Sequence, residues 1–326
     1  VKYRHVLKDG TISGGPMWYI SQGLKNKWLA GFFAFSGALS AFGIGNMAQS
    51  NSVALVLVKS WRIHEIVTGL TLAILTSLVI VGGIKRIGRI TEFLVPIMSL
   101  LYIGAALLIL LFNISKIDDV FSLIITHAFS PIAASGGFAG AAISQAIRYG
   151  IIRGVFSNEA GLGSTPIAHA AAQTDSPFNQ GLVSMSGIFF DTIIICSMTA
   201  FVILIFPEAW TSGENSSSLT SLAFNCGIPS IGKHIVTLSL VTFAFSTIIG
   251  WSYYGEKCIQ YLCGFSAAAP YRLVYCLFVA IGAISEVNLV WDLSDILNAS
   301  MALPNLIALL FLSGSIFSEV NTTNRR

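Results

Sequence analysis

The stretch FSLIITHAFSPIAASGGFAGAAISQAIRYG, residues 121–150, is long and apolar enough to cross a membrane, yet glycines interrupt it. Gly136, Gly137, Phe138 and Gly140 fall near its middle. At that depth an unpaired backbone group costs several kcal/mol unless protein buries it or it lines a cavity. The free N–H and C=O groups at the ends of two half-helices can bind a carboxylate and a cation. The stretch predicts either a broken helix at a binding site or glycines that let a second helix pack closely.

The composition of the whole chain is also that of a membrane protein. Of 326 residues, 54% are hydrophobic and 10% are charged, and the mean hydropathy is +0.77. Soluble domains carry roughly 25% charged residues, and a β-barrel would show short alternating segments. We therefore expect an all-α polytopic membrane protein with a single transmembrane domain over residues 28–316. A span needs about 20 apolar residues, and eight candidates lie near 28–57, 64–83, 92–113, 121–150, 181–206, 234–262, 271–286 and 290–316.

The basic residues predict the orientation. If the N-terminal segment is cytoplasmic, only Lys59, Arg62, Lys116 and Lys233, of 18 Lys and Arg, fall in outer segments. Cytoplasmic loops carry an excess of Lys and Arg. The pattern predicts that residues 1–27 and the tail 317–326 are both cytoplasmic, and we expect the protein in the cell inner (plasma) membrane. Basic residues that lie between apolar runs do not indicate a nucleic-acid partner.

Two segments between spans have a composition of their own. Residues 207–233 are rich in Ser, Gly and Asn, which predicts a long exterior loop. Residues 166–172 on the inner side predict either a short amphipathic helix or an ordinary connector.

Polar side chains inside three spans are candidate site residues. Asn46 and Gln49 are three residues apart, so they share a helix face that either binds a ligand or joins two helices by hydrogen bonds. Asp191 lies inside the span 181–206, and Asp292 and Asp295 lie near the start of the last span. An acid at that depth indicates either function or a structural hydrogen-bond acceptor.

The sequence FAFSTIIGWSYYGEK, residues 243–257, combines hard oxygen donors with a large aromatic side chain. The hydroxyls of Ser246 and Thr247, with the carbonyl of Phe243 one turn earlier, are ligands suited to Na⁺. Trp251 follows one turn later and could form one side of a small pocket beside the ion. The alternative is that both hydroxyls bond back to carbonyls of their own helix. No P-loop, H-E-x-x-H or G-x-S-x-G pattern is present, so neither ATP-driven transport nor an enzyme is expected.

Several stretches together resemble the alanine or glycine:cation symporter family. They are GGPMWYISQGL at 14–24, FGIGNMAQSNSVA at 42–54, GGIKRIGRITEFLVP at 82–96, residues 136–175, QGLVSMSGIFFDTIIICSMTA at 180–200, FAFSTIIGWSYYGEKC at 243–258 and MALPNLIALLFLS at 301–313. The match is collinear and covers nearly the whole chain.

The resemblance implies a leucine-transporter-like fold of two inverted repeats of five helices. It implies a secondary active symporter that takes up alanine or glycine by alternating access, driven by Na⁺ or, in some members, H⁺. Residues 28–113 would be the remainder of the first repeat and 121–316 the second repeat. About three N-terminal helices of the family would be lacking, so an inactive fragment or a non-transporting homolog is the alternative.

The resemblance also implies roles for residues. Asn46, Gln49 and Trp251 would contact the amino acid, together with the glycine-rich break at Gly136, Gly137, Phe138 and Gly140. Na⁺ would bind the Phe243 carbonyl, Ser246 and Thr247.

Overall fold

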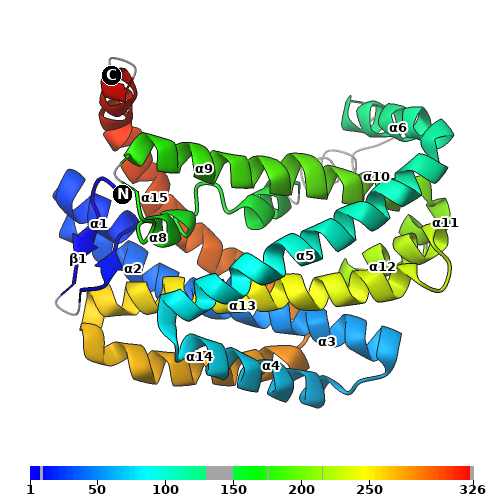
Figure 1. The fold of residues 1–326 in the computed structure, drawn as a ribbon, viewed down its shortest axis with the longest axis horizontal. Coiled ribbons are helices and arrows are strands. Elements are labelled where there is room, and N and C mark those ends of the chain that lie inside the picture. Colours follow the sequence, from blue (N-terminus) through cyan, green and yellow to red (C-terminus); the bar gives the residue numbers. More distant parts are fainter. Residues whose placement is uncertain (8–9, 130–149, 175, 215, 324–326) are drawn as a thin grey trace, which may run out of the picture.

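The computed structural model describes residues 1–7, 10–129, 150–174, 176–214 and 216–323, which are mainly helical (Figure 1). An antiparallel hairpin of β1 (His5–Val6) and β2 (Ile12–Ser13) comes first. The α-helices are α1 (Pro16–Gly23), α2 (Lys27–Phe42), α3 (Ala48–Trp61), α4 (Glu65–Ile80), α5 (Gly83–Phe112), α6 (Ile117–Phe129), α8 (Thr165–His169), α9 (Pro177–Phe189), α10 (Ser197–Ile205), α11 (Pro207–Trp210), α12 (Ser216–Gly227), α13 (Gly232–Cys263), α14 (Ala268–Ile284) and α15 (Val287–Thr323). Residues 150–158 are also helical.

Long apolar helices confirm an all-α polytopic membrane protein. Within the described residues, six helices are long and apolar enough to cross a membrane, namely Lys27–Trp61, Gly83–Phe112, Pro177–Ile205, Gly232–Cys263, Phe265–Ile284 and Val287–Ser315. The shorter α4 is apolar as well. These seven correspond to seven of the eight predicted spans. The eighth, 121–150, lies largely outside the described residues, and so do Gly136, Gly137, Phe138 and Gly140.

The outer surface of these helices suits contact with lipid. Leu70, Ile74 and Leu78 repeat at a spacing of four on α4 and are each more than half exposed. Leu100 on α5 and Leu310 on α15 are more than 70% exposed. Rows of large exposed aliphatic side chains are an aggregation liability in water, whereas hydrocarbon solvates them well.

A π-helical turn interrupts the first long helix. Residues Gly43–Met47 form this turn, η1, between α2 and α3. A π turn takes in an additional residue, so the side chains beyond it are rotated relative to a regular helix. The expectation that Asn46 and Gln49 share a helix face assumes regular α-helical geometry. Asn46 lies in this π turn and Gln49 follows it in α3, so regular geometry does not apply between the two residues. A second π-helical segment, η4 (Phe190–Cys196), joins α9 to α10 in the same way.

The prediction of an exterior loop over residues 207–233 is wrong in one respect: the segment contains two helices, α11 and α12. Its serines suggested a loop. However, Leu219, Leu222, Ala223 and Cys226 recur at the i, i+3, i+4, i+7 spacing of an amphipathic helix. These side chains pack into a buried cluster with α5, α10 and α13. On the inner side, the short helix predicted at 166–172 is present as α8, over Thr165–His169.

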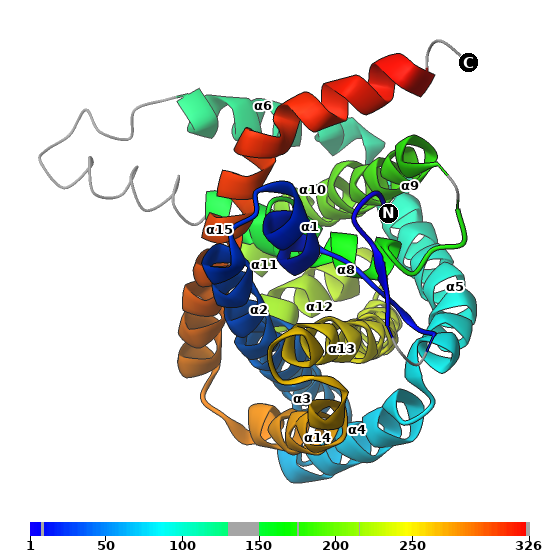
Figure 2. The ribbon, with the colours of Figure 1, turned by 90° about the vertical axis from the view of Figure 1, so that its left-hand side faces the viewer.

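Helix α13 forms the centre of the bundle. It packs against α2, α3, α4, α5, α12 and α14, and Figure 2 shows these helices around it. The main hydrophobic cluster forms about its middle and includes Ile248, Ile249 and Trp251, with Phe33 from α2 and Tyr275 from α14. The segment singled out from the sequence, 243–257, therefore lies in the interior of the protein.

Candidate functional site

A cavity of about 300 Å³ lies between α5 and α13. This is within the size range of small-molecule sites. Its lining residues are Ile84, Ile87, Gly88, Thr91 and Val95 from α5, Ser246, Thr247, Gly250, Trp251, Tyr253 and Tyr254 from α13, Ala168 from α8, and Glu159. The walls are mostly apolar, with a few hydroxyls and one carboxylate among them. Three sequence-predicted site residues, Ser246, Thr247 and Trp251, thus border one space.

The two hydroxyls are arranged by their own helix. Ser246 Oγ donates to the Phe243 carbonyl at 2.8 Å, and Thr247 Oγ1 donates to the same oxygen at 3.0 Å. This is the back-bonded arrangement that the sequence left open as an alternative. It directs both hydroxyl hydrogens to one carbonyl, and each hydroxyl oxygen keeps lone pairs for a further partner. Two hydroxyls and a carbonyl are neutral, hard oxygen donors, but in this arrangement the carbonyl accepts both hydroxyl hydrogens.

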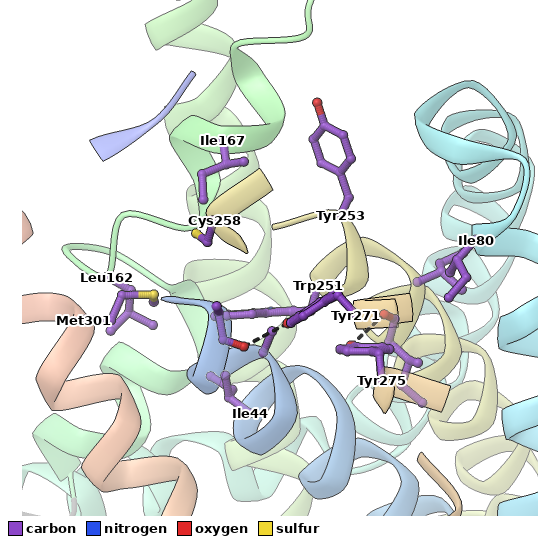
Figure 3. Close-up of a cluster of buried hydrophobic side chains, with 14 of the residues drawn as sticks. Ile44, Ile80, Leu162, Ile167, Trp251, Tyr253, Cys258, Tyr271, Tyr275 and Met301 are labelled. Atoms are coloured by element: carbon purple, nitrogen blue, oxygen red, sulfur yellow. Dashed lines mark hydrogen bonds between the residues drawn. The ribbon is translucent and has the colours of Figure 1, made fainter. Parts of the chain in front are cut away.

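Trp251 is held on several sides. It is 2% exposed and packs edge-on to Tyr254, with ring centroids 5.4 Å apart. A Cβ added to Gly45 of η1 would lie 2.2 Å from the Trp251 Cβ, so the backbone of η1 lies directly against this residue. Figure 3 shows Trp251 in the buried cluster that also includes Tyr271 and Tyr275.

Glu159 is a site residue that the sequence interpretation missed. Trp251 Nε1 donates to Glu159 Oε1 at 2.7 Å, and the hydroxyl of Ser164 donates to Glu159 Oε2. Burial raises the pKa of the Glu159 carboxyl, while these two hydrogen bonds oppose the rise. The predicted spans contain Asp191, Asp292 and Asp295, whereas Glu159 lies between the predicted spans 121–150 and 181–206. The available signal was an acid in the glycine-containing sequence NEAGLGS, residues 158–164.

Asn46 and Gln49 do not border this cavity. The Asn46 amide donates from Nδ2 to the Tyr275 carbonyl at 2.7 Å, and its Oδ1 is buried with no hydrogen-bond partner among the described residues. The Gln49 amide donates to the Ile44 carbonyl at 3.1 Å. Tyr275 in turn donates its hydroxyl to the carbonyls of Gly45 and Ile248. These bonds join η1, α13 and α14.

Two of the three predicted intramembrane acids, Asp191 and Asp295, have partners outside the cavity. Ser157 donates its hydroxyl to Asp191 Oδ2 at 2.8 Å. Arg153 forms an ion pair with Asp295 at 2.7 Å, and its guanidinium lies over the Trp291 ring, 4.5 Å from the centroid. Both acids therefore receive hydrogen bonds from the helical residues 150–158, which agrees with the structural alternative.

Comparison with known proteins gives one consistent result. The sequence profile of the sodium:alanine symporter family matches residues 1–326. The sodium/alanine symporter AgcS of Methanococcus maripaludis is 48% identical over 333 residues, covering 99% of this chain and 72% of AgcS. An uncharacterized transporter of Haemophilus influenzae is 47% identical, covering 98% of this chain and 70% of that protein. The probable sodium/glutamine symporter GlnT of Bacillus subtilis is 35% identical, covering 96% and 65%. The family predicted from the sequence motifs is confirmed, and this chain belongs to the sodium:alanine symporter family.

Proposed function

We propose that the protein is a secondary active symporter that takes up a small neutral amino acid, alanine or glycine, driven by the Na⁺ gradient. The observation that carries the proposal is that Ser246, Thr247 and Trp251 line one cavity of about 300 Å³. Family membership and the similarity to a sodium/alanine symporter support the same substrates. A buried indole beside the cavity limits the side chain that fits there, which favours alanine and glycine over larger amino acids.

Na⁺ is the proposed co-substrate, held by Ser246, Thr247 and the Phe243 carbonyl. The neutral oxygen set supports this proposal, because a monovalent ion needs no carboxylate to offset its charge. The Phe243 carbonyl already accepts from both hydroxyls. Binding of the ion would therefore require the two hydroxyl hydrogens to rotate away from that oxygen.

The proposal also covers the transport mechanism, the fold, the orientation in the membrane and the substrate contacts outside the cavity. Transport proceeds by alternating access in a leucine-transporter-like fold, with residues 28–113 in the first repeat and 121–316 in the second. Both ends of the chain lie in the cytoplasm and the domain lies in the inner membrane. Asn46, Gln49 and the glycine-rich segment 136–140 remain proposed substrate contacts. The two amides would reach the substrate only after giving up their present carbonyl partners.

Uptake into proteoliposomes tests the proposal. The gene product, with any coding sequence that continues in frame before Val1, would be given labelled alanine or glycine with and without an inward Na⁺ gradient. We expect accumulation with the gradient and none without it. The variant Ser246→Ala with Thr247→Ala should lose the Na⁺ dependence.

The matched control is Thr242→Ala. Thr242 lies on the same helix and also bonds back to carbonyls of that helix, but it does not line the cavity. The control should accumulate substrate like the wild type. Unchanged Na⁺ dependence in the double variant would refute the ion site. A folded wild type without uptake would refute the transport proposal and favour a non-transporting homolog.

A further inference from the structure

Glu159 contributes the one carboxylate among the described residues that line the cavity, and both of its oxygens accept hydrogen bonds. Oε1 accepts the indole N–H of Trp251 at 2.7 Å. Oε2 accepts the hydroxyl of Ser164, a residue with no exposed surface. The indole nitrogen is a donor only, and a buried tryptophan normally needs an acceptor. The Glu159 carboxylate therefore serves as the acceptor that satisfies and orients Trp251.

The backbone that presents Glu159 is unusual. Its φ is +54°, a left-handed conformation that non-glycine residues seldom adopt and that costs on the order of 1–3 kcal/mol. The chain enters the turn with a hydrogen bond from Glu159 N to the Val155 carbonyl at 3.0 Å. Asn158 Oδ1 accepts from Ala160 N at 2.8 Å, which closes a local side-chain turn. Such strain persists where the surrounding structure fixes it.

The rest of the turn is fixed by its neighbours. Asn305 of α15 donates to the Gly161 carbonyl at 2.8 Å. Gly163 has a φ of +90°, and a Cβ there would lie 2.6 Å from Pro16 and 2.9 Å from Phe33. The turn is thus packed against α1, α2 and α15, and none of these helices contributes a residue to the cavity lining. A carboxylate on this turn has a fixed position relative to α13.

We propose that Glu159 is a positioning residue for substrate selection: it holds the Trp251 indole in place as a wall of the cavity, through a hydrogen bond anchored by Ser164. The role lies in the acceptor oxygen and its position, not in a charge offered to the substrate. This inference rests on the proposed function, since Trp251 acts on the substrate and Glu159 acts through Trp251.

The hydrogen bond can be tested without any transport assay. The protein would be labelled with [¹⁵N-indole]tryptophan in detergent micelles, and the Trp251 signal would be identified among six tryptophans by its loss in Trp251→Phe. Glu159→Gln keeps an acceptor oxygen at the same reach, so its Trp251 signal should stay near the wild-type position. Glu159→Asp retracts the carboxylate by one methylene and Glu159→Leu removes it, so both should shift the signal upfield. Wild-type positions in Asp and Leu variants would overturn the proposal.

Transport of labelled alanine and of the larger 2-aminobutyrate gives the functional readout, with Glu159→Gln as the matched control. A hydrogen bond between neutral groups, which the Gln variant keeps, is worth up to about tenfold in an equilibrium constant. We expect the Asp and Leu variants to raise KM for alanine about tenfold, to narrow the preference for alanine over 2-aminobutyrate, and to leave the maximal rate nearly unchanged. The Gln variant should behave like the wild type in all three respects.

Two outcomes separate the proposals. Equal defects in the Gln and Leu variants would mean that the substrate senses the charge of Glu159 directly, which overturns the positioning role. A wild type that transports neither amino acid would refute the proposed function, while the indole signal would still show whether Glu159 holds Trp251. The Asp variant keeps the test decisive where the Leu variant fails to fold.

Discussion

Gly45→Ala is the substitution that most directly probes the packing behind the cavity. An added Cβ would lie 2.2 Å from the Cβ of Trp251 and 2.4 Å from its Cγ. These atoms are at the base of the side chain, so rotation of the indole cannot relieve the contact, and η1 and α13 must separate. Overpacking a filled core costs typically about 1–3 kcal/mol, whereas replacing a helical glycine by alanine gains about 0.5–1 kcal/mol. The difference is about 0–2.5 kcal/mol. Because the contact is with nearly rigid atoms, we expect a net loss in the upper part of that range, about 1–2.5 kcal/mol.

The matched control is Gly31→Ala in α2, where an added Cβ meets no atom within 4 Å. This variant has only the favourable term and should be as stable as the wild type or more so. Thermal unfolding in detergent, followed by circular dichroism, measures both. With about 2.1 cal/mol/K of unfolding entropy per residue, a loss of 1 kcal/mol lowers the melting temperature of a 326-residue chain by about 1.5 °C. A Gly45→Ala protein that melts at or above the wild type would refute the packing argument.

Three further predictions address stability and topology. Arg272→Gln breaks the bidentate ion pair with Glu256, whose carboxylate accepts two hydrogen bonds at 2.6 and 2.8 Å. It should lower the free energy of unfolding by about 1–3 kcal/mol. Adding Glu256→Gln should restore part of that loss in the same melting assay, and no recovery would contradict the pairing. Tyr275→Phe removes the hydroxyl that joins Gly45 and Ile248 and should destabilise by about 1–3 kcal/mol; an unchanged melting temperature would contradict it. Cys263 is exposed at the end of α13, so a membrane-impermeant maleimide should label it in inside-out vesicles only. Labelling of right-side-out vesicles that Cys263→Ser abolishes would reverse the proposed orientation.

The spans could be predicted because the bilayer imposes one simple requirement, a long apolar run. In the part of the chain that the structure describes, seven of the eight expected segments are helices, and the eighth lies largely outside it. The errors occur where another rule applies. Helix α5 begins at Gly83, before the predicted start at 92. The prediction followed the apolar run alone, whereas the helix also includes Lys85 and Arg86, which precede that run. Helix α12 was missed because its serines concealed a regular apolar spacing.

The site was predictable in part. Ser246, Thr247 and Trp251 occur in one short sequence on one helix, so local spacing was enough to bring them together. The contribution of Glu159 depends on how a turn more than 80 residues earlier folds back on α13, and local spacing carries no information about that. The π turn at Gly43–Met47 was equally hidden: it packs against α14 and Trp251, which lie far from it in the sequence.

The position of the hydroxyl pair along α13 has an electrical consequence. Glu256, Lys257 and Gln260 are joined by side-chain hydrogen bonds near the end of α13. From Gly232 to Glu256 the helix rises about 36 Å, close to the thickness of a bilayer's hydrocarbon core. Thr247 is 15 residues from the first of these ends and nine from the second, so an ion there lies near the midplane. A unit charge that crosses the whole membrane potential changes its energy by about 2.3 kcal/mol per 100 mV. An ion that enters from either side to this depth crosses roughly half of that field. Occupancy of the proposed Na⁺ site should therefore respond to voltage as well as to concentration.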